Sequence, residues 1–130
     1  IDSVIVLGTG GASKTVIYFC KKNNIQFKIL SRKKSKDCLS YKEVNHSFFE
    51  GNVLIVNCTP IGTYPKINEC PDLPYNLFNK ENILFDLVYN PPETLFIKKG
   101  KEIGCKTLNG YEMLKFQAEK SWNLWTKSFK

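Results

Sequence analysis

A short apolar run that ends directly in a glycine-rich turn is the feature that most constrains how this sequence folds. Residues 4–7 read Val-Ile-Val-Leu and lead into Gly8-Thr9-Gly10-Gly11, after which apolar residues recur with helical spacing. A continuous apolar run of this length is typical of a strand buried on both faces of a parallel sheet. The sequence therefore predicts a strand, a tight turn and a helix over residues 12–24, the opening unit of an α/β fold.

The same alternation of strands and helices continues along the chain. Apolar runs predict three further buried strands and a short edge strand, at residues 27–30, 53–56, 83–88 and 106–108. The other predicted segments are helices at 93–103 and 110–127, a partly helical stretch at 39–50 and a proline-rich loop at 59–74. Because strands alternating with helices form βαβ units, we expect a Rossmann-like, doubly wound α/β fold, with a mostly parallel sheet and helices on both faces.

Length and composition fit one folded domain. The chain has 130 residues, of which 42% are hydrophobic, and this is enough for a packed core. It contains no run of about 18 apolar residues, so we expect no membrane span. Because so few residues precede the first apolar run, we expect the sequence to be truncated at its N-terminus.

The cysteines favour reduced thiols and a cytoplasmic location. The five are far apart, form no Cys-x-x-Cys pair and are accompanied by a single histidine, His46. We therefore expect neither a zinc cluster nor a disulfide framework, but mostly buried free thiols. They are Cys20, Cys38, Cys58, Cys70 and Cys105.

The glycine turn has the composition of a phosphate-binding loop. Glycines permit positive φ and leave space for a pyrophosphate, and the helix that follows presents unpaired N–H groups to the anion. Gly8 and Gly10 have the spacing of the first two glycines in the dinucleotide-binding motif G-x-G-x-x-G, while Ser13 takes the third position. Ser13 is small enough to allow close packing of helix on strand. A purely structural turn is the alternative interpretation.

A cationic cluster follows the second predicted strand. It reads Ser31-Arg32-Lys33-Lys34-Ser35-Lys36 and lacks the acidic residue that bonds the adenosine ribose in NAD-binding domains. Arg32 is the only arginine among 19 basic residues, and a guanidinium bonds a phosphate in a fork geometry. The sequence therefore favours NADP over NAD, with a solvated basic loop as the alternative.

Five motifs, in order, resemble those of the shikimate dehydrogenase family and cover nearly the whole chain. The glycine turn resembles the family's G-x-G-G-A-x-R/K, and the cationic cluster resembles its Asn-Arg-Thr-x-x-Arg phosphate clamp. The other three are Asn57-Cys58-Thr59-Pro60-Ile61-Gly62, Asp86-Leu87-Val88-Tyr89-Asn90-Pro91, and Asn109-Gly110-Tyr111-Glu112-Met113-Leu114 with Gln117-Ala118 and Trp122 to Trp125. Ser31, Lys33 and Lys36 depart from the family clamp, which makes it more cationic and less specific in hydrogen bonding. The resemblance implies the C-terminal NADP-binding domain of such an enzyme, over residues 1–130.

The resemblance also implies roles for individual residues. Tyr89 and Gln117 would face the substrate, although a half-buried core ring and an exposed helix residue are the respective alternatives. The family's catalytic lysine and aspartate belong to an N-terminal substrate domain that would precede Ile1, so we expect no catalytic residue in this chain. The implied cofactor-binding residues are Gly8, Gly10, Gly11, Ala12, Ser31, Arg32, Lys33, Lys36, Thr59, Pro60, Leu87 and Gly110.

The implied activity is that of the full-length enzyme, with the isolated chain inactive. It is NADPH-dependent reduction of 3-dehydroshikimate to shikimate, on the route to chorismate and the aromatic amino acids. We expect a monomer or homodimer with no metal, nucleic-acid or membrane partner. A quinate-type dehydrogenase and a catalytically silent NADP sensor are alternatives. The net charge of +7 also leaves a nucleic-acid-binding module open, although no aromatic residues are interleaved with the lysines near residues 31–36.

Overall fold

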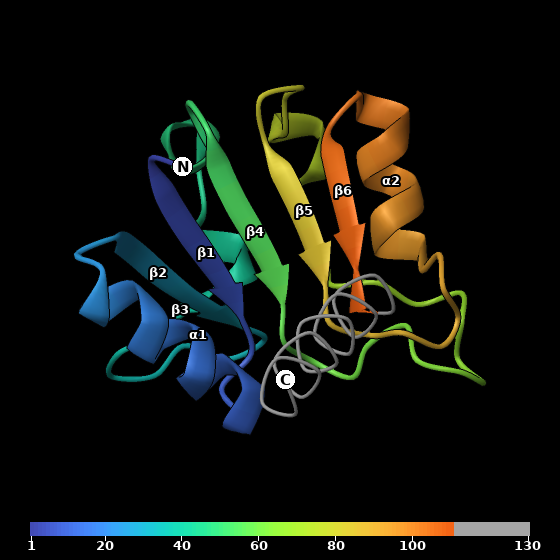
Figure 1. Cartoon of the computed structure of the whole chain (residues 1–130), viewed down its shortest axis with the longest axis horizontal. Coiled ribbons are helices and arrows are strands. Elements are labelled where there is room, and N and C mark those ends of the chain that lie inside the picture. The colour runs from blue at the N-terminus through green and yellow to red at the C-terminus, as the bar shows by residue number, and fades with distance from the viewer. Residues whose placement is uncertain (111–130) are drawn as a thin grey trace, which may run out of the picture.

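Within residues 1–110, which the computed structural model describes, six strands form one sheet and all of them run parallel (Figure 1). The order across the sheet is β3-β2-β1-β4-β5-β6, which confirms the predicted doubly wound fold. The sheet is entirely parallel rather than mostly parallel. The strands are β1 (Ser3–Leu7), β2 (Gln26–Ser31), β3 (Leu39–Ser40), β4 (Val53–Asn57), β5 (Ile83–Asp86) and β6 (Lys106–Asn109).

β1 and β4 lie side by side at the centre of the sheet. Residues 4–7 of β1 are all buried, because each face of a central parallel strand is covered. The chain leaves β1 towards β2 and β3 on one side, and then returns to β4 on the other side. This reversal places the topological switch point between the carboxyl ends of β1 and β4.

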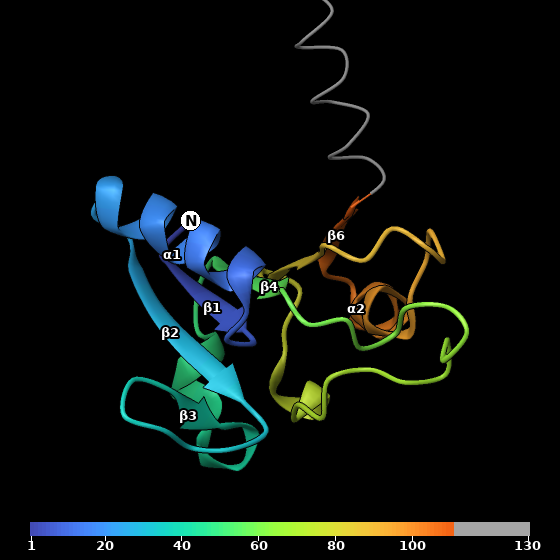
Figure 2. The ribbon, with the colours of Figure 1, turned by 90° about the horizontal axis from the view of Figure 1, so that it is seen from below.

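Two helices cover opposite faces of the sheet, as predicted (Figure 2). They are α1 (Gly11–Lys22) and α2 (Leu95–Ile103). Successive β1 side chains point to opposite faces, so the strand contributes to both cores. The α1 face buries Val4, Val6, Cys20 and Val56, and the α2 face buries Ile5, Leu7, Ile55 and Phe96 among others.

The ends of α2 follow from local side-chain chemistry. The Thr94 hydroxyl accepts a hydrogen bond from the backbone N–H of Ile97 at 3.3 Å, so the helix begins at Leu95, two residues later than predicted. The proline pair at 91–92 therefore precedes the cap. Gly104 ends the helix at φ +96, a left-handed conformation that glycine adopts without strain.

Short elements fill the segment between β2 and β4. β3 is followed by two 3-10 helices, η1 (Tyr41–Glu43) and η2 (His46–Phe49). The prediction of a partly helical segment is confirmed, but β3 was missed. A two-residue strand is too short to carry a periodic pattern.

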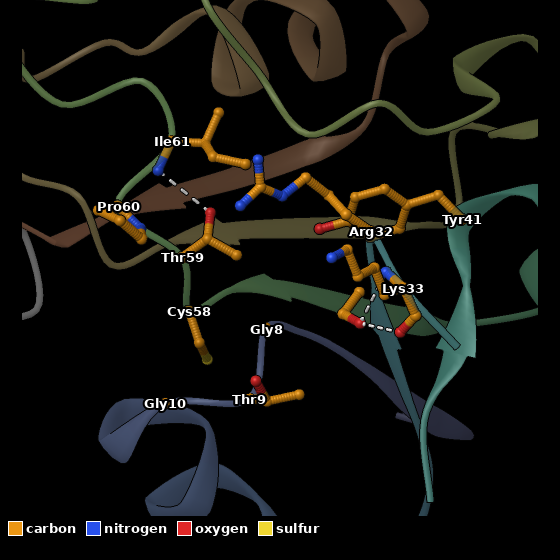
Figure 3. A pocket seen from close by; sticks show the side chains of 11 residues that line it. Gly8, Thr9, Gly10, Arg32, Lys33, Tyr41, Cys58, Thr59, Pro60 and Ile61 are labelled. Atoms are coloured by element: carbon orange, nitrogen blue, oxygen red, sulfur yellow. Dashed lines mark hydrogen bonds between the residues drawn. The ribbon is translucent and has the colours of Figure 1, made fainter. Parts of the chain in front are cut away.

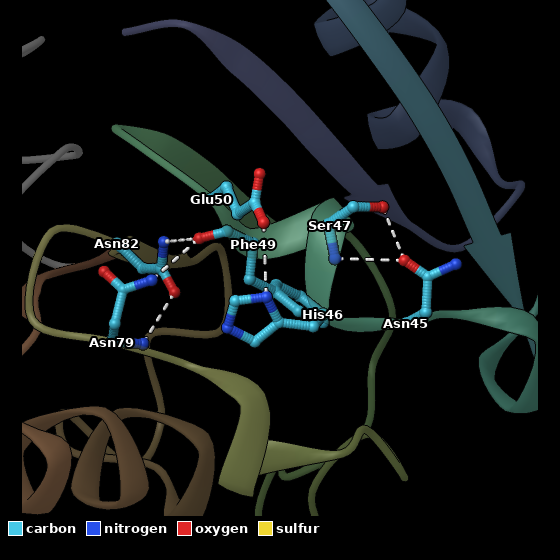
Figure 4. A network of polar contacts seen from close by, with 7 residues as sticks. All are labelled: Asn45, His46, Ser47, Phe49, Glu50, Asn79 and Asn82. Carbon is cyan, nitrogen blue, oxygen red and sulfur yellow. Dashed lines mark hydrogen bonds and ion pairs between the residues drawn. The ribbon is translucent and has the colours of Figure 1, made fainter.

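A buried polar network fixes the amino-terminal edge of the sheet (Figure 4). The side-chain amides of Asn79 and Asn82, just before β5, both donate to the Phe49 carbonyl oxygen, at 2.8 and 2.9 Å. Asn82 also accepts from the Asn79 backbone N–H at 3.0 Å and donates to the Gly51 carbonyl oxygen at 3.3 Å. Because Asn82 is fully buried, these bonds tie η2 to the entry of β5.

The last predicted helix, over residues 110–127, lies outside the described residues from position 111 onward. None of the helices within residues 1–110 has the length and hydrophobicity that crossing a bilayer requires. All five cysteines are free thiols, three of them buried and two partly buried.

Candidate functional site

A cavity of about 790 Å³ opens at the carboxyl edge of the sheet, at the switch point (Figure 3). Open α/β sheets bind ligands in a crevice at this position. Four strands contribute to it, because the carboxyl ends of parallel strands meet at one edge. Its lining residues are Gly8, Thr9, Gly10, Ser31, Arg32, Lys33, Tyr41, Cys58, Thr59, Pro60 and Ile61.

The cavity brings together most of the residues that the sequence singled out for the cofactor. Gly11 and Ala12 do not line it but begin α1, directly after the turn. Sequence reasoning missed Tyr41, which follows the two-residue β3 and belongs to no recognised motif. It also assigned no role to Thr9, Cys58 and Ile61, although all three lie inside motifs that it recognised. The predicted residues that line the cavity are Gly8, Gly10, Ser31, Arg32, Lys33, Thr59 and Pro60.

The glycine turn depends on a close approach at Gly8. Gly8 has φ +106, a conformation that residues with a side chain rarely adopt. A Cβ at this position would also lie only 2.9 Å from the Thr59 Cγ2 atom, so both the backbone and the space favour glycine. A Cβ at Gly10 or Gly11 would meet nothing within 4 Å, which leaves the space before α1 open. Ser13 is buried and donates to the Gly10 carbonyl oxygen at 2.6 Å, which fits the small residue expected at the third motif position.

No side chain caps the amino end of α1, whose first turn contains no acidic residue. The N–H groups and the positive end of the helix dipole therefore remain available to an anion in front of the turn. This is the local chemistry that a phosphate group requires.

The Arg32 guanidinium extends into the cavity (Figure 3). It forms no hydrogen bond or ion pair with any residue in the described range. Arg32 also borders a second cavity of about 410 Å³, whose other walls include Glu69 and Asp72. A guanidinium without a protein partner keeps all its N–H donors for an anionic ligand.

Ser31 shapes the basic loop. Its hydroxyl donates to the Lys33 carbonyl oxygen at 2.6 Å and accepts from the Lys33 N–H at 3.3 Å and from the Cys38 thiol at 3.2 Å. These bonds occupy the hydroxyl proton, so in this structure Ser31 orders the turn that presents Arg32 and Lys33 to the cavity.

The other two lysines of the cationic cluster point elsewhere. Lys34 forms an ion pair with Glu43 at 3.0 Å. A hydrogen bond from the Ser40 backbone and the Lys34 ammonium together lower the pKa of the Glu43 carboxyl. Lys36 borders a separate cavity of about 330 Å³ beside Phe27 and Leu39. The structure therefore brings Lys33, but not Lys36, to the cavity that Arg32 lines.

Asn57, the last residue of β4, is fully buried behind the opposite wall of the cavity and bonds the residues that form it. Its side-chain oxygen accepts from the Thr59 N–H at 3.0 Å and from the Thr59 hydroxyl at 2.6 Å. Its amide donates to the Ile61 carbonyl oxygen at 3.3 Å and to the Asp86 carboxylate at 3.1 Å. The backbone around Thr59 and Pro60 is thereby fixed against the glycine turn. Sequence reasoning recognised the motif of Asn57 without seeing this role.

Asp86, at the end of β5, accepts a hydrogen bond from the Asn57 side chain and so helps to orient it. Its carboxylate accepts three hydrogen bonds, from the Asn57 amide at 3.1 Å, the Val88 N–H at 3.0 Å and the Thr94 hydroxyl at 2.6 Å. Burial raises the pKa of this carboxyl, and the hydrogen bonds from Thr94, Val88 and Asn57 oppose that rise. Asp86 is fully buried and lines none of the cavities described above, so it acts through the residues it holds.

The residues predicted for the nicotinamide and the substrate lie further along the same edge. Gly110 packs directly on Leu87, because a Cβ at Gly110 would collide with the Leu87 carbonyl group. Tyr89 is 61% exposed, so the alternative of a half-buried core ring is wrong. Gln117 lies outside the described residues. Leu87, Tyr89 and Gly110 do not line the cavity that holds Arg32.

The strand order and the glycine turn at the switch point define a Rossmann-type fold, the class of fold in which dinucleotide-binding domains are found. No family model matches the chain. The chain is 35% identical to the shikimate dehydrogenase (NADP(+)) of Methanococcus aeolicus, over 95% of this chain and 49% of that protein. It is 37% identical to the enzyme of the same name from Clostridium beijerinckii, over 93% of this chain and 47% of that protein.

A solved structure gives the same relationship. The shikimate 5-dehydrogenase of Thermus thermophilus, in complex with NADP(H) and shikimate, matches with a TM-score of 0.73 and 28% identity. The match covers 95% of this chain and 49% of that one. These relatives confirm the resemblance of the motifs to the shikimate dehydrogenase family, and the chain spans about half the length of the relatives that it matches.

Proposed function

We propose that this chain is the NADP-binding domain of a shikimate dehydrogenase, and that the intact enzyme reduces 3-dehydroshikimate to shikimate with NADPH. The observation that carries the proposal is the Arg32 guanidinium, which extends into the cavity of the glycine turn without a partner among residues 1–110. The relatives are named both for this activity and for NADP(+).

The residues present fit the cofactor. The open space in front of Gly10 and Gly11 suits a pyrophosphate at the amino end of α1. Arg32 and Lys33 are the cations for the adenosine 2′-phosphate, at the far end of the same cavity. Thr59 and Pro60 form the wall between these two points.

When bound, NADP supplies the hydride chemistry. The residues of this chain bind and orient: the turn and Arg32 fix the adenosine end, while the backbone at Leu87 and Gly110 is assigned to the nicotinamide end. We assign Tyr89 and Gln117 to the substrate. The family resemblance implies that the catalytic lysine and aspartate belong to an N-terminal substrate domain, and the match to about half of each relative supports this division.

Two earlier alternatives are less well supported. The relatives favour a shikimate dehydrogenase over a quinate-type enzyme and over a nucleic-acid-binding module. A monomeric or homodimeric state and a cytoplasmic location remain predictions from the sequence.

Calorimetric titration of the intact protein with NADPH and NADH tests the proposal. We expect NADPH to bind at least tenfold more tightly, because only NADPH carries the phosphate that Arg32 faces. The same protein should oxidise NADPH when 3-dehydroshikimate is added, which the loss of NADPH absorbance reports. Equal affinity for both nucleotides would show that the Arg32 cluster does not select the cofactor. NADPH binding without turnover would overturn the enzymatic part alone.

A further inference from the structure

Tyr41 stands between the two cavities that meet at Arg32. It begins η1, directly after β3, and a capping box fixes this short helix. In that box Ser40 accepts from the Lys42 N–H at 3.3 Å, while Glu43 accepts from the Ser40 N–H at 2.7 Å. The Tyr41 side chain is only 6% exposed and belongs to the core that α2 covers.

The ring is held in the core while its polar end is left free. The Tyr41 hydroxyl bonds no residue in the described part of the chain. Among those residues, every side-chain oxygen or nitrogen without solvent access has a hydrogen-bond partner. Because the Tyr41 hydroxyl has no partner, it must reach open space in a cavity. Figure 3 shows the hydroxyl and the Arg32 side chain extending into the cavity side by side. A buried phenol with an unused hydroxyl beside an unpaired guanidinium is an arrangement that a ligand would complete.

The chemistry of this pair suits a phosphate. Burial raises the pKa of the Tyr41 phenol to about 12, against the opposing effect of the Arg32 charge, so the hydroxyl keeps its proton at neutral pH. A neutral O–H donor and a guanidinium can bond different oxygens of one phosphate dianion. The carboxylates on the other side, Glu69 and Asp72, line only the second cavity and would repel an anion placed there.

We propose that Tyr41 is a specificity-determining residue of the nucleotide site, whose hydroxyl donates a hydrogen bond to the 2′-phosphate that Arg32 binds. The inference rests on the proposed function and adds to it a residue that lies in no glycine-turn or arginine motif. Both side chains line the two cavities, and they lie beside each other in Figure 3.

Calorimetric titration of the intact protein with two small probes tests this role. Adenosine 2′,5′-bisphosphate carries the 2′-phosphate, and adenosine 5′-monophosphate lacks it. Tyr41→Phe keeps the buried ring and removes only the hydroxyl. We expect it to weaken the bisphosphate about tenfold and the monophosphate less than twofold. In an Arg32→Ala background the same change should have a much smaller effect on the bisphosphate, because both groups bind one phosphate.

Tyr75→Phe is the matched control. Tyr75 is a partly buried tyrosine that packs against the same core, but its hydroxyl donates to the Pro71 carbonyl oxygen at 2.6 Å, and Tyr75 lines neither cavity. This variant should leave both affinities unchanged. Equal losses for both probes in Tyr41→Phe, or no loss for either, would overturn the role of Tyr41. If the unaltered protein showed no preference for the bisphosphate, the proposed NADP function itself would fail.

Discussion

The two edges of the sheet use polar residues in opposite ways. At the amino-terminal edge, the side-chain amides of Asn79 and Asn82 both donate hydrogen bonds to the Phe49 carbonyl oxygen (Figure 4). The Asn82 amide also donates to the Gly51 carbonyl oxygen. At the carboxyl edge, Arg32 and the Tyr41 hydroxyl have no partner among residues 1–110 and extend into a cavity (Figure 3). Bonded polar groups at the amino-terminal edge connect segments of the fold, whereas polar groups without a protein partner at the carboxyl edge are available to a ligand.

The carboxyl edge is itself layered. Arg32 and the Tyr41 hydroxyl form an outer layer, and Asn57 and Asp86 form an inner one. The two inner residues are fully buried, and their side chains are hydrogen-bonded to protein groups. This inner layer fixes the loop of Thr59, which forms the other wall of the cavity into which Arg32 and Tyr41 extend. The comparison therefore predicts that variants at the amino edge change stability, while variants of the outer layer change ligand affinity.

Asn82→Ala should have the largest effect on folding. It removes three hydrogen bonds of a fully buried side chain, to the Phe49 and Gly51 carbonyls and from the Asn79 N–H, so we expect the free energy of unfolding to fall by about 2 to 4 kcal/mol. Urea unfolding followed by circular dichroism measures the loss. Nucleotide affinity below the unfolding transition should change less than twofold.

Asn45→Ala is the matched control for Asn82. Asn45 belongs to the same region but is exposed, where its side chain accepts from the Ser47 N–H at the start of η2. Its removal should lower the free energy of unfolding by about 1 kcal/mol or less. Equal losses for the two variants would mean that burial does not distinguish these asparagines.

Arg32→Ala should have the next largest effect, and on affinity alone. Loss of a charge-assisted bond to the phosphate should weaken NADPH binding about 30-fold, with little change for NADH. Stability should be unaffected, because Arg32 has no partner among the described residues. Calorimetry with both nucleotides measures the difference.

Lys34→Ala removes the same charge from the same loop, but Lys34 pairs with Glu43 and does not line the cavity. NADPH affinity should therefore change less than twofold. A loss like that of Arg32→Ala would show that net charge, and not the position of the guanidinium, selects the cofactor.

The two edges also differ in how far the sequence predicted them. The sequence predicted the strand, turn and helix around Gly8 and the cations around Arg32. These features depend on residues that are close together in the chain. Five of the six strands within residues 1–110 were predicted from apolar runs, whereas β3 was missed and the order of the strands was not predicted. The hydrogen bonds of Asn82 and the place of Tyr41 in the cavity were not predicted, because both depend on segments that only the folded sheet brings together. Lys36 is close to Arg32 in the sequence, but it borders a separate cavity.

The smallest predicted effect concerns the pH dependence of the inner layer. Burial raises the pKa of Asp86 in the folded state above its ordinary value of 3.8, so its protonated form favours folding. Its contribution to the free energy of unfolding is therefore greatest below that value and is lost as pH rises through the folded-state pKa. Urea unfolding of the protein and of Asp86→Asn across this range isolates the contribution, because the other carboxyls cancel in the difference. The difference for Asn82→Ala should stay constant with pH, since the hydrogen bonds of the Asn82 side chain are all to backbone groups. If the Asp86 difference instead grew as pH rose, the three hydrogen bonds would outweigh burial, and the inner layer would bind its carboxylate as an anion.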